Sequence, residues 1–126
     1  MPNSNARILV VDDELHTRRM ICRILRQIGF DNLDENDGTT VLQALKTNKL
    51  DLVICDWRMT PEPGIEVLKF VRADADLKDL PFIMLTGENT SEAVVAAMHA
   101  GVDGYVTKPC SMETLRTKVE RALSMK

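Results

Sequence analysis

Short apolar segments rich in β-branched residues alternate with helical patterns along this chain of 126 residues. Four of them have the length and composition of buried strands: RILVV at 7–11, DLVIC at 51–55, PFIML at 81–85 and GYV at 104–106. A polar segment, FDNLDEND at 30–37, fits an exposed edge strand. This alternation predicts a doubly wound α/β fold, in which a five-stranded parallel sheet has helices on both faces.

Five other segments have the apolar spacing of amphipathic helices, and their ends carry recognisable signals. Asn89 and Glu92 resemble a capping box, and Ser111 can cap the last helix. Gly29 and Gly101 stand where left-handed C-terminal caps belong. The apolar positions are Ile21, Ile24, Leu25 and Ile28; Val41, Leu42 and Leu45; Val67, Leu68 and Val71; Ala93, Val94, Ala97 and Met98; and Met112, Leu115, Val119, Ala122 and Leu123.

The length allows one domain with one core, which we place at 7–124, after a disordered tail at 1–6. The net charge is −3, and lysines and arginines are scattered among acids, so no surface for nucleic acid is expected. Charged residues interrupt every apolar stretch well short of a membrane span, and the polar start MPNSNAR has no signal core. The sequence therefore predicts neither export nor membrane insertion.

The three cysteines, Cys22, Cys55 and Cys110, are widely spaced and form no CxxC or Cys/His cluster. Neither a disulfide framework nor a zinc site is indicated, and reduced thiols in the cytoplasm fit best. Successive side chains of a strand point to opposite faces, so we expect Cys55 to point away from Asp56 and into the interior. Met84 and Met98 are also expected to pack in the core.

Polar side chains follow four of the apolar strands. Asp12 and Asp13 follow the strand at 7–11, and Asp56 follows the strand at 51–55. Thr86 ends the next strand, and Lys108 comes just after the last. One such residue alone would be an ordinary turn former. Because ligands of doubly wound sheets bind at the carboxyl ends of the strands, polar residues at all four strand ends indicate a functional site there.

The chemistry of these residues favours phosphoryl transfer. Three carboxylates brought together repel one another unless a cation intervenes, and an all-oxygen acidic pocket suits Mg²⁺. The ammonium of Lys108 and the hydroxyl of Thr86 can stabilise the oxygens of a phosphoryl group. Asp56 can then act as a nucleophile that forms an acyl phosphate.

Four motifs stand at the ends of the apolar strands: VVDDE at 10–14, VICDWRM at 53–59, MLTG at 84–87 and GYVTKP at 104–109. They resemble those of response-regulator receiver domains of bacterial two-component systems, most of all the stand-alone CheY type. The resemblance spans Arg7 to Leu123 and implies a flavodoxin-like, CheY-like sheet of strand order 2-1-3-4-5.

The resemblance also implies roles for individual residues. Asp56 resembles the phosphoacceptor, and Asp13, Asp56 and the backbone carbonyl of Arg58 resemble the direct ligands of Mg²⁺, for which Mn²⁺ can substitute. Asp12 resembles the carboxylate that acts through metal-bound water. Thr86 and Lys108 resemble the groups that contact the phosphoryl oxygens. The family also implies a switching aromatic side chain at Tyr105 and a cis peptide bond between Lys108 and Pro109.

Partners follow from the same resemblance. The implied donor is a phosphohistidine on a sensor kinase or a phosphotransfer protein. The implied target is a protein that binds the face formed by the fourth helix, fifth strand and fifth helix. The chain would be a monomer or a phosphorylation-dependent dimer. It would catalyse its own phosphorylation and slow autodephosphorylation, as a signalling receiver and not as an enzyme acting on other substrates.

The chain departs from the family pattern at a few positions around the site. Thr60 stands where the family has a proline, while Gly64 keeps its usual distance from Asp56. Gly87 replaces the more usual alanine and leaves donor access open. Arg58 and Glu88 can form an ion pair that shields the acyl phosphate, or can be two solvated charges. These residues and Gly87 are candidate modulators of the phosphate lifetime.

Two other functions use similar residues. A haloacid dehalogenase-like phosphatase also has an aspartyl nucleophile, Mg²⁺, a threonine and a lysine, but it needs a second Asp where this chain has Glu14. A receiver-like adaptor would bind partners without phosphorylation, against which the complete acidic pocket argues. A flavin site is disfavoured because the anionic VVDDE loop would repel the cofactor phosphate.

Overall fold

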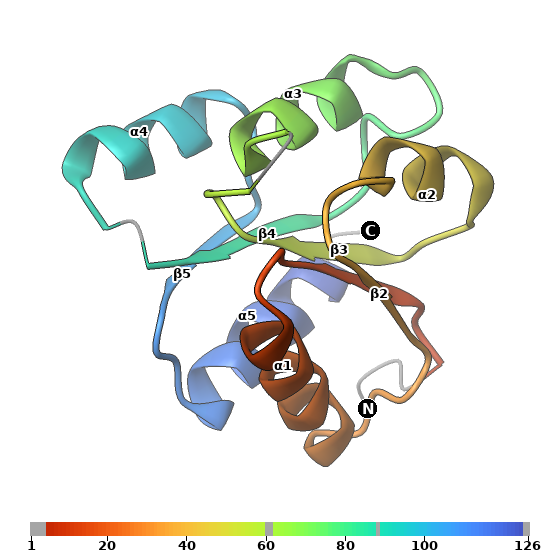
Figure 1. Ribbon diagram of the computed structural model, residues 1–126, viewed down its shortest axis with the longest axis vertical. Helices are drawn as coiled ribbons and strands as arrows, with labels where there is room; N and C mark the ends of the chain where they lie inside the picture. The colour runs from red at the N-terminus through yellow and green to blue at the C-terminus, as the bar shows by residue number, and fades with distance from the viewer. Residues whose placement is uncertain (1–4, 60–61, 88, 125–126) are drawn as a thin grey trace.

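One parallel sheet with helices on both faces makes up the computed structural model, which describes residues 5–59, 62–87 and 89–124 (Figure 1). The strands are β1 Ile8–Val11, β2 Leu33–Asn36, β3 Leu52–Cys55, β4 Phe82–Thr86 and β5 Gly104–Thr107. The helices are α1 Leu15–Gln27, α2 Val41–Thr47, α3 Gly64–Ala73, α4 Ser91–His99 and α5 Met112–Ser124. The strand order is β2-β1-β3-β4-β5, which confirms the predicted doubly wound fold and its order.

The sheet separates two apolar layers. Helices α1 and α5 cover one face, and α2, α3 and α4 cover the other (Figure 1). Side chains alternate between the two layers along each strand. In β1, for example, Ile8 and Val10 pack toward α1 and α5, whereas Leu9 and Val11 pack toward α2 and α3. Cys55 and Met84 are fully buried in the second layer, as predicted.

The polar strand β2 lies at an edge of the sheet, as its sequence predicts. It pairs in parallel with β1 alone, with Glu35 opposite Val10. Its acidic side chains form ion pairs with arginines: Arg7 Nε lies 2.6 Å from Asp34, and Arg18 Nε lies 3.0 Å from Glu35. The polar edge strand is thus bonded through its backbone on one side, and two of its acidic side chains are paired.

Three predicted helix ends are confirmed. Gly29 and Gly101 have φ of +106° and +94°, the left-handed conformation that ends α1 and α4. At the start of α5, Ser111 Oγ accepts a hydrogen bond from the Thr114 N–H at 3.1 Å.

Two predictions about α4 are wrong. The N-cap is Thr90, whose side-chain oxygen accepts a hydrogen bond from the Ala93 N–H, and the capping box expected at Asn89 lies one residue too early. Met98 is 66% exposed instead of packed in the core. The reason is that α4 buries a narrow stripe of small side chains, Ala93 and Ala97, and the next position is turned about 100° away from the sheet.

The ends of the chain were predicted to lie outside the domain. Residues 1–4 of the predicted tail at 1–6 fall outside the described part, while Ala6 is buried beside the layer of α1 and α5. Within the described residues, no helix combines the length and the apolar character needed to cross a membrane.

Candidate functional site at the carboxyl edge of the sheet

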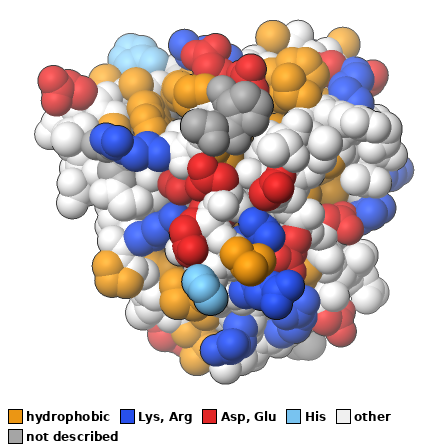
Figure 2. Space-filling view, in the orientation of Figure 1, with side chains coloured by type: hydrophobic (Ala, Val, Ile, Leu, Met, Phe, Trp, Pro, Cys, Tyr) orange, Lys and Arg blue, Asp and Glu red, His pale blue; other side chains and the backbone are white. Residues whose placement is uncertain are grey.

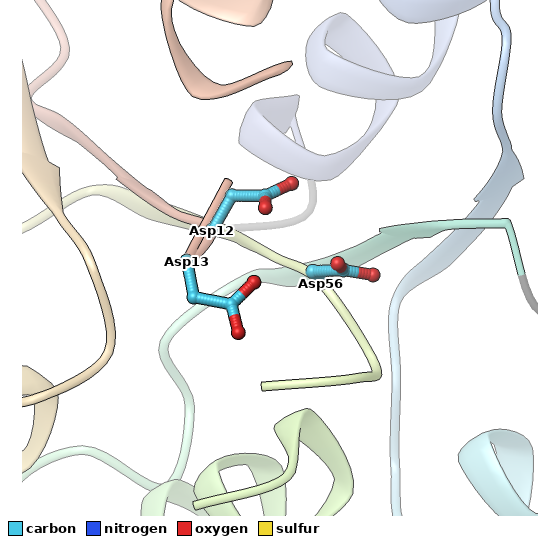
Figure 3. A group of neighbouring side chains, drawn as sticks. All are labelled: Asp12, Asp13 and Asp56. Carbon is cyan, nitrogen blue, oxygen red and sulfur yellow. The ribbon is translucent and has the colours of Figure 1, made fainter. Parts of the chain in front are cut away.

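Three aspartates meet where β1 and β3 end (Figure 3). Asp12 and Asp13 follow β1, and Asp56 follows the neighbouring strand β3. One carboxylate oxygen of each lies within 4.8 Å of the others. Asp12 is 1% exposed and Asp56 is 8% exposed, whereas Asp13 faces solvent. The site is therefore a half-buried acidic pocket with one side open, and Figure 2 shows acidic side chains gathered at the middle of this face.

Lys108 reaches into this pocket from the end of β5. Its Nζ lies 2.7 Å from Asp12 Oδ2 and 3.2 Å from Asp56 Oδ2. Its backbone N–H donates to the carbonyl of Thr86 at 2.8 Å, which fixes the base of the side chain beside β4. Burial alone would lower the pKa of Lys108, but the hydrogen bonds and charges of the two carboxylates outweigh burial and raise it. Lys108 is thus held as an ammonium ion.

Burial raises the pKa of Asp12 above its ordinary value, although hydrogen bonds from Lys108 and from the Glu14 N–H pull it down. The cost of removing this carboxylate from water therefore exceeds what one ammonium returns. Its Oδ1 accepts from the Glu14 N–H at 2.9 Å. In the same way, Asp56 Oδ1 accepts from the Trp57 N–H at 2.7 Å, so backbone groups orient both carboxylates.

Thr86 lies on β4, the strand next to the acidic pocket, and Tyr105 lies on β5, one strand further out. Thr86 ends β4 and is 1% exposed, and Tyr105 is half-buried on β5 against the layer of α2, α3 and α4. The peptide bond between Lys108 and Pro109 is cis, as the resemblance implies. The structure therefore brings Asp12, Asp13, Asp56 and Lys108 together, and places Thr86 at the end of the adjacent strand.

Other predicted positions are placed only in part. Arg58 is exposed and follows Asp56 by two residues. Glu88 lies outside the described residues, and with it the predicted ion pair between Arg58 and Glu88. The unusual Thr60 also lies outside them.

Gly64 and Arg18 are important to the site in ways that the sequence analysis missed. A Cβ on Gly64 would lie 2.0 Å from the backbone oxygen of Asp56, so only glycine allows α3 to start here. Arg18 Nη1 donates to the backbone oxygen of Asp12 at 2.8 Å. The spacing of Gly64 from Asp56 was a usable signal for the first. For the second, the signal was the helical spacing, because Arg18 precedes Ile21 by three residues and lies on its apolar stripe, whereas Arg19 does not.

The residues present fit a divalent cation. Three carboxylates and one ammonium leave two negative charges in the pocket, and every anionic donor is oxygen, as hard cations prefer. Within the described residues, the Asp13 side chain forms no hydrogen bond or ion pair, so its oxygens are available as ligands.

Gly87 offers a test of the backbone beside the pocket. Among the described residues, a Cβ at this position would meet no atom within 4 Å, and its φ is not positive. We expect Gly87→Ala to stabilise the fold by about 0.4–1 kcal/mol, because alanine reduces the freedom of the unfolded chain. Urea unfolding measures this difference. Destabilisation would show that the loop after β4 needs conformations open only to glycine.

The residue types at the carboxyl edge of the sheet indicate the class of protein. Doubly wound folds that bind nucleotides or flavins have a glycine-rich or hydroxyl-rich loop here, whereas this edge carries aspartates and a lysine, as in receiver domains. Residues 8–120 match the family model of the response regulator receiver domain. The chain belongs to that family.

Its relatives include chemotaxis proteins of the CheY type. The chain is 43% identical to the chemotaxis protein CheY-3 of Vibrio cholerae over 120 residues, which cover 94% of this chain and 92% of the relative. It is also 43% identical to CheY of Pseudomonas aeruginosa over 116 residues, covering 91% and 94%. These matches confirm the predicted family and give no support to a haloacid dehalogenase-like phosphatase, a flavin protein or an adaptor.

Solved structures agree with the fold. The response regulator CheY4 of Vibrio cholerae superposes with a TM-score of 0.84 at 31% identity, covering 94% of this chain and 99% of that chain. A putative response regulator of Chloroflexus aurantiacus gives 0.89 at 30% identity, covering 95% and 98%. The chain is thus a receiver domain of two-component signalling.

Proposed function

We propose that this receiver accepts a phosphoryl group on Asp56, from a phosphohistidine on a sensor kinase or phosphotransfer protein, with the aid of Mg²⁺ or Mn²⁺. The observation that carries the proposal is the position of the Asp56 carboxylate. It lies 3.2 Å from the ammonium of Lys108 and within 4.8 Å of the other two aspartates, of which Asp13 faces solvent. The pocket therefore holds a nucleophile, carboxylates that can bind a cation, and an ammonium that can contact the phosphoryl oxygens.

In this mechanism a carboxylate oxygen of Asp56 attacks phosphorus, the bond between phosphorus and the donor nitrogen breaks, and the donor histidine leaves. Asp12, Asp13, Asp56 and the backbone carbonyl of Arg58 would hold the cation. When bound, the cation neutralises charge on the phosphoryl oxygens. Lys108 exchanges its contact with Asp56 for a phosphoryl oxygen, and Asp12 keeps it in the pocket through the 2.7 Å ion pair.

The output is a change in affinity at the face of α4, β5 and α5. Contacts of Thr86 and Lys108 with the phosphoryl group would favour a state in which Tyr105 turns inward. Val95 is 52% exposed and Met98 is 66% exposed on α4, which gives this face apolar contacts for a protein target. A bias of about 1.4 kcal/mol between the two states is enough for a tenfold change in affinity.

Two further features belong to this proposal. The receiver catalyses its own phosphorylation and loses the phosphoryl group slowly by hydrolysis, at a rate that Arg58, Glu88 and Gly87 modulate. It works in the cytoplasm, where its thiols stay reduced, as a monomer or as a phosphorylation-dependent dimer.

The proposal is tested with Asp56→Asn. The wild-type protein should gain the mass of one phosphoryl group from acetyl phosphate only when Mg²⁺ is present, and Asp56→Asn should gain none. Trp57 reports the same events, because its backbone N–H donates to the Asp56 carboxylate and it is the only tryptophan of the chain. Beryllofluoride should change its fluorescence in the wild type and not in the variant.

Asp79→Asn is a matched control, since it removes the same charge from an exposed position on the connection between α3 and β4. It should be phosphorylated like the wild type. Phosphoryl transfer to Asp56→Asn, or none to the wild type, would refute the proposal, and the second outcome would favour an adaptor.

A further inference from the structure

Arg18 connects the acidic pocket to the edge of the sheet. It lies on α1, and its side chain is 14% exposed. Its Nη1 donates to the backbone oxygen of Asp12 at 2.8 Å, and its Nε donates to Glu35 Oε1 on β2 at 3.0 Å. Arg19, the next residue, is exposed, and its side chain makes no hydrogen bond or ion pair within the described part of the chain. Two neighbouring arginines therefore have different environments.

The contact of Arg18 completes the bonding of Asp12. The backbone N–H of Asp12 donates to the Asn36 carbonyl at 3.1 Å. Its two carboxylate oxygens accept from the Glu14 N–H and from Lys108. The backbone oxygen is the last polar atom, and Arg18 holds it. Because that oxygen belongs to the peptide group that leads into Asp13, fixing it also fixes the direction of the next residue.

Asp13 depends on this backbone for its position. Its carboxylate faces solvent and, within the described residues, accepts no hydrogen bond and forms no ion pair. Even so, it turns toward the space shared with Asp12 and Asp56 (Figure 3). Within the described residues no hydrogen bond or ion pair keeps the carboxylate there, so its place depends on the orientation of the preceding peptide group.

We propose that Arg18 is a positioning residue that, through the Asp12 carbonyl, holds Asp13 in the cation site. The inference rests on the proposed function, because it concerns the affinity of the same pocket for Mg²⁺. The sign of the effect separates positioning from charge. A nearby arginine repels a divalent cation, so removal of its charge alone would tighten binding. Removal of a positioning contact weakens it, as for other groups that orient metal ligands.

Arg18→Met and Arg19→Met remove the same charge from adjacent positions on α1. Titration with Mg²⁺, followed by Trp57 fluorescence, should show Arg18→Met binding about tenfold more weakly than the wild type. Arg19→Met should bind as tightly as the wild type or slightly more tightly. Urea unfolding establishes that both variants are folded under the conditions of the titration.

A second pair of variants, Arg18→Lys and Arg19→Lys, keeps the positive charge. It tests the inference even if Arg18→Met does not fold. In Arg18→Lys the single ammonium is drawn to Glu35 and leaves the Asp12 carbonyl, because lysine lacks the fork that contacts both acceptors. Arg18→Lys should therefore bind Mg²⁺ more weakly than Arg19→Lys. Equal affinities in this pair would overturn the inference.

Asp13→Asn shows whether Arg18 acts through Asp13. In that background, Arg18→Met should no longer weaken the binding of Mg²⁺. A persistent tenfold loss would overturn the proposed route, and so would Arg18→Met binding as tightly as Arg19→Met. If the wild type itself binds no Mg²⁺, it is the proposed function that fails, so the two failures are distinguishable.

Discussion

Replacing Gly64 with alanine is expected to destabilise the protein by about 3 kcal/mol, the upper end of the usual cost of overpacking. The added Cβ would lie 2.0 Å from the Asp56 backbone oxygen, 2.9 Å from its carbonyl carbon and 3.1 Å from Trp57 Cα. These are backbone atoms, so no side-chain rotation can relieve the contact. The φ of Gly64 is not positive, so the cost comes from the contact and not from backbone strain.

The same substitution should slow phosphorylation. The Gly64 N–H donates to the Trp57 carbonyl at 2.7 Å, which joins the start of α3 to the strand end that carries Asp56. Moving α3 away breaks this bond, and moving Asp56 away displaces the nucleophile. Urea unfolding and the rate of acyl phosphate formation measure the two effects. Gly87→Ala is the matched control for the unfolding measurement, since its Cβ meets open space among the described residues.

A Gly64→Ala protein of wild-type stability and wild-type phosphorylation rate would contradict this view. It would show that the loop before α3 moves by the required distance without cost. Because the φ of Gly64 is not positive, backbone strain does not contribute, and the measured change in stability reports the steric contact alone.

The fold could be predicted because its signals are local and mutually consistent. Each buried strand is a short apolar run, and parallel strands place their carboxyl ends at one edge of the sheet. Asp12, Asp56 and Lys108 therefore had to approach one another once the order of strands was known. Their contacts of 2.7 and 3.2 Å follow from topology, although the sequence positions are far apart.

The features that were predicted wrongly or missed differ from their neighbours in the chain by one position, which is about 100° of rotation around a helix. Asn89 and Thr90 are both good N-caps, and only tertiary packing decides which of them starts α4. Met98 continues an apolar pattern, but α4 meets the sheet through two alanines and leaves the adjacent position in solvent. Arg18 differs from Arg19 by about 100° around α1, which separates a contact with the site from exposure to water.

Lys108→Met is expected to destabilise the protein by about 3 kcal/mol at neutral pH without Mg²⁺, the lower end of the cost of breaking a buried ion pair. The lower end applies because water reaches part of the Lys108 side chain, which is 23% exposed. Its loss leaves the carboxylate of Asp12, 1% exposed, beside that of Asp56 with no ammonium between them. Urea unfolding of the two proteins across a range of pH measures the difference.

The pH dependence of this loss identifies its cause. Burial already raises the pKa of Asp12 in the folded protein, and removal of Lys108 raises it further. The folded variant therefore binds a proton more tightly than the unfolded chain, so its stability rises as the pH falls from neutral through the raised pKa of Asp12. The deficit relative to the wild type should shrink over that range, and Asp12→Asn in the Lys108→Met background should remove most of it at neutral pH. A deficit that stays constant with pH would mean that Lys108 stabilises the fold through the packing of its methylene groups, and not through its charge.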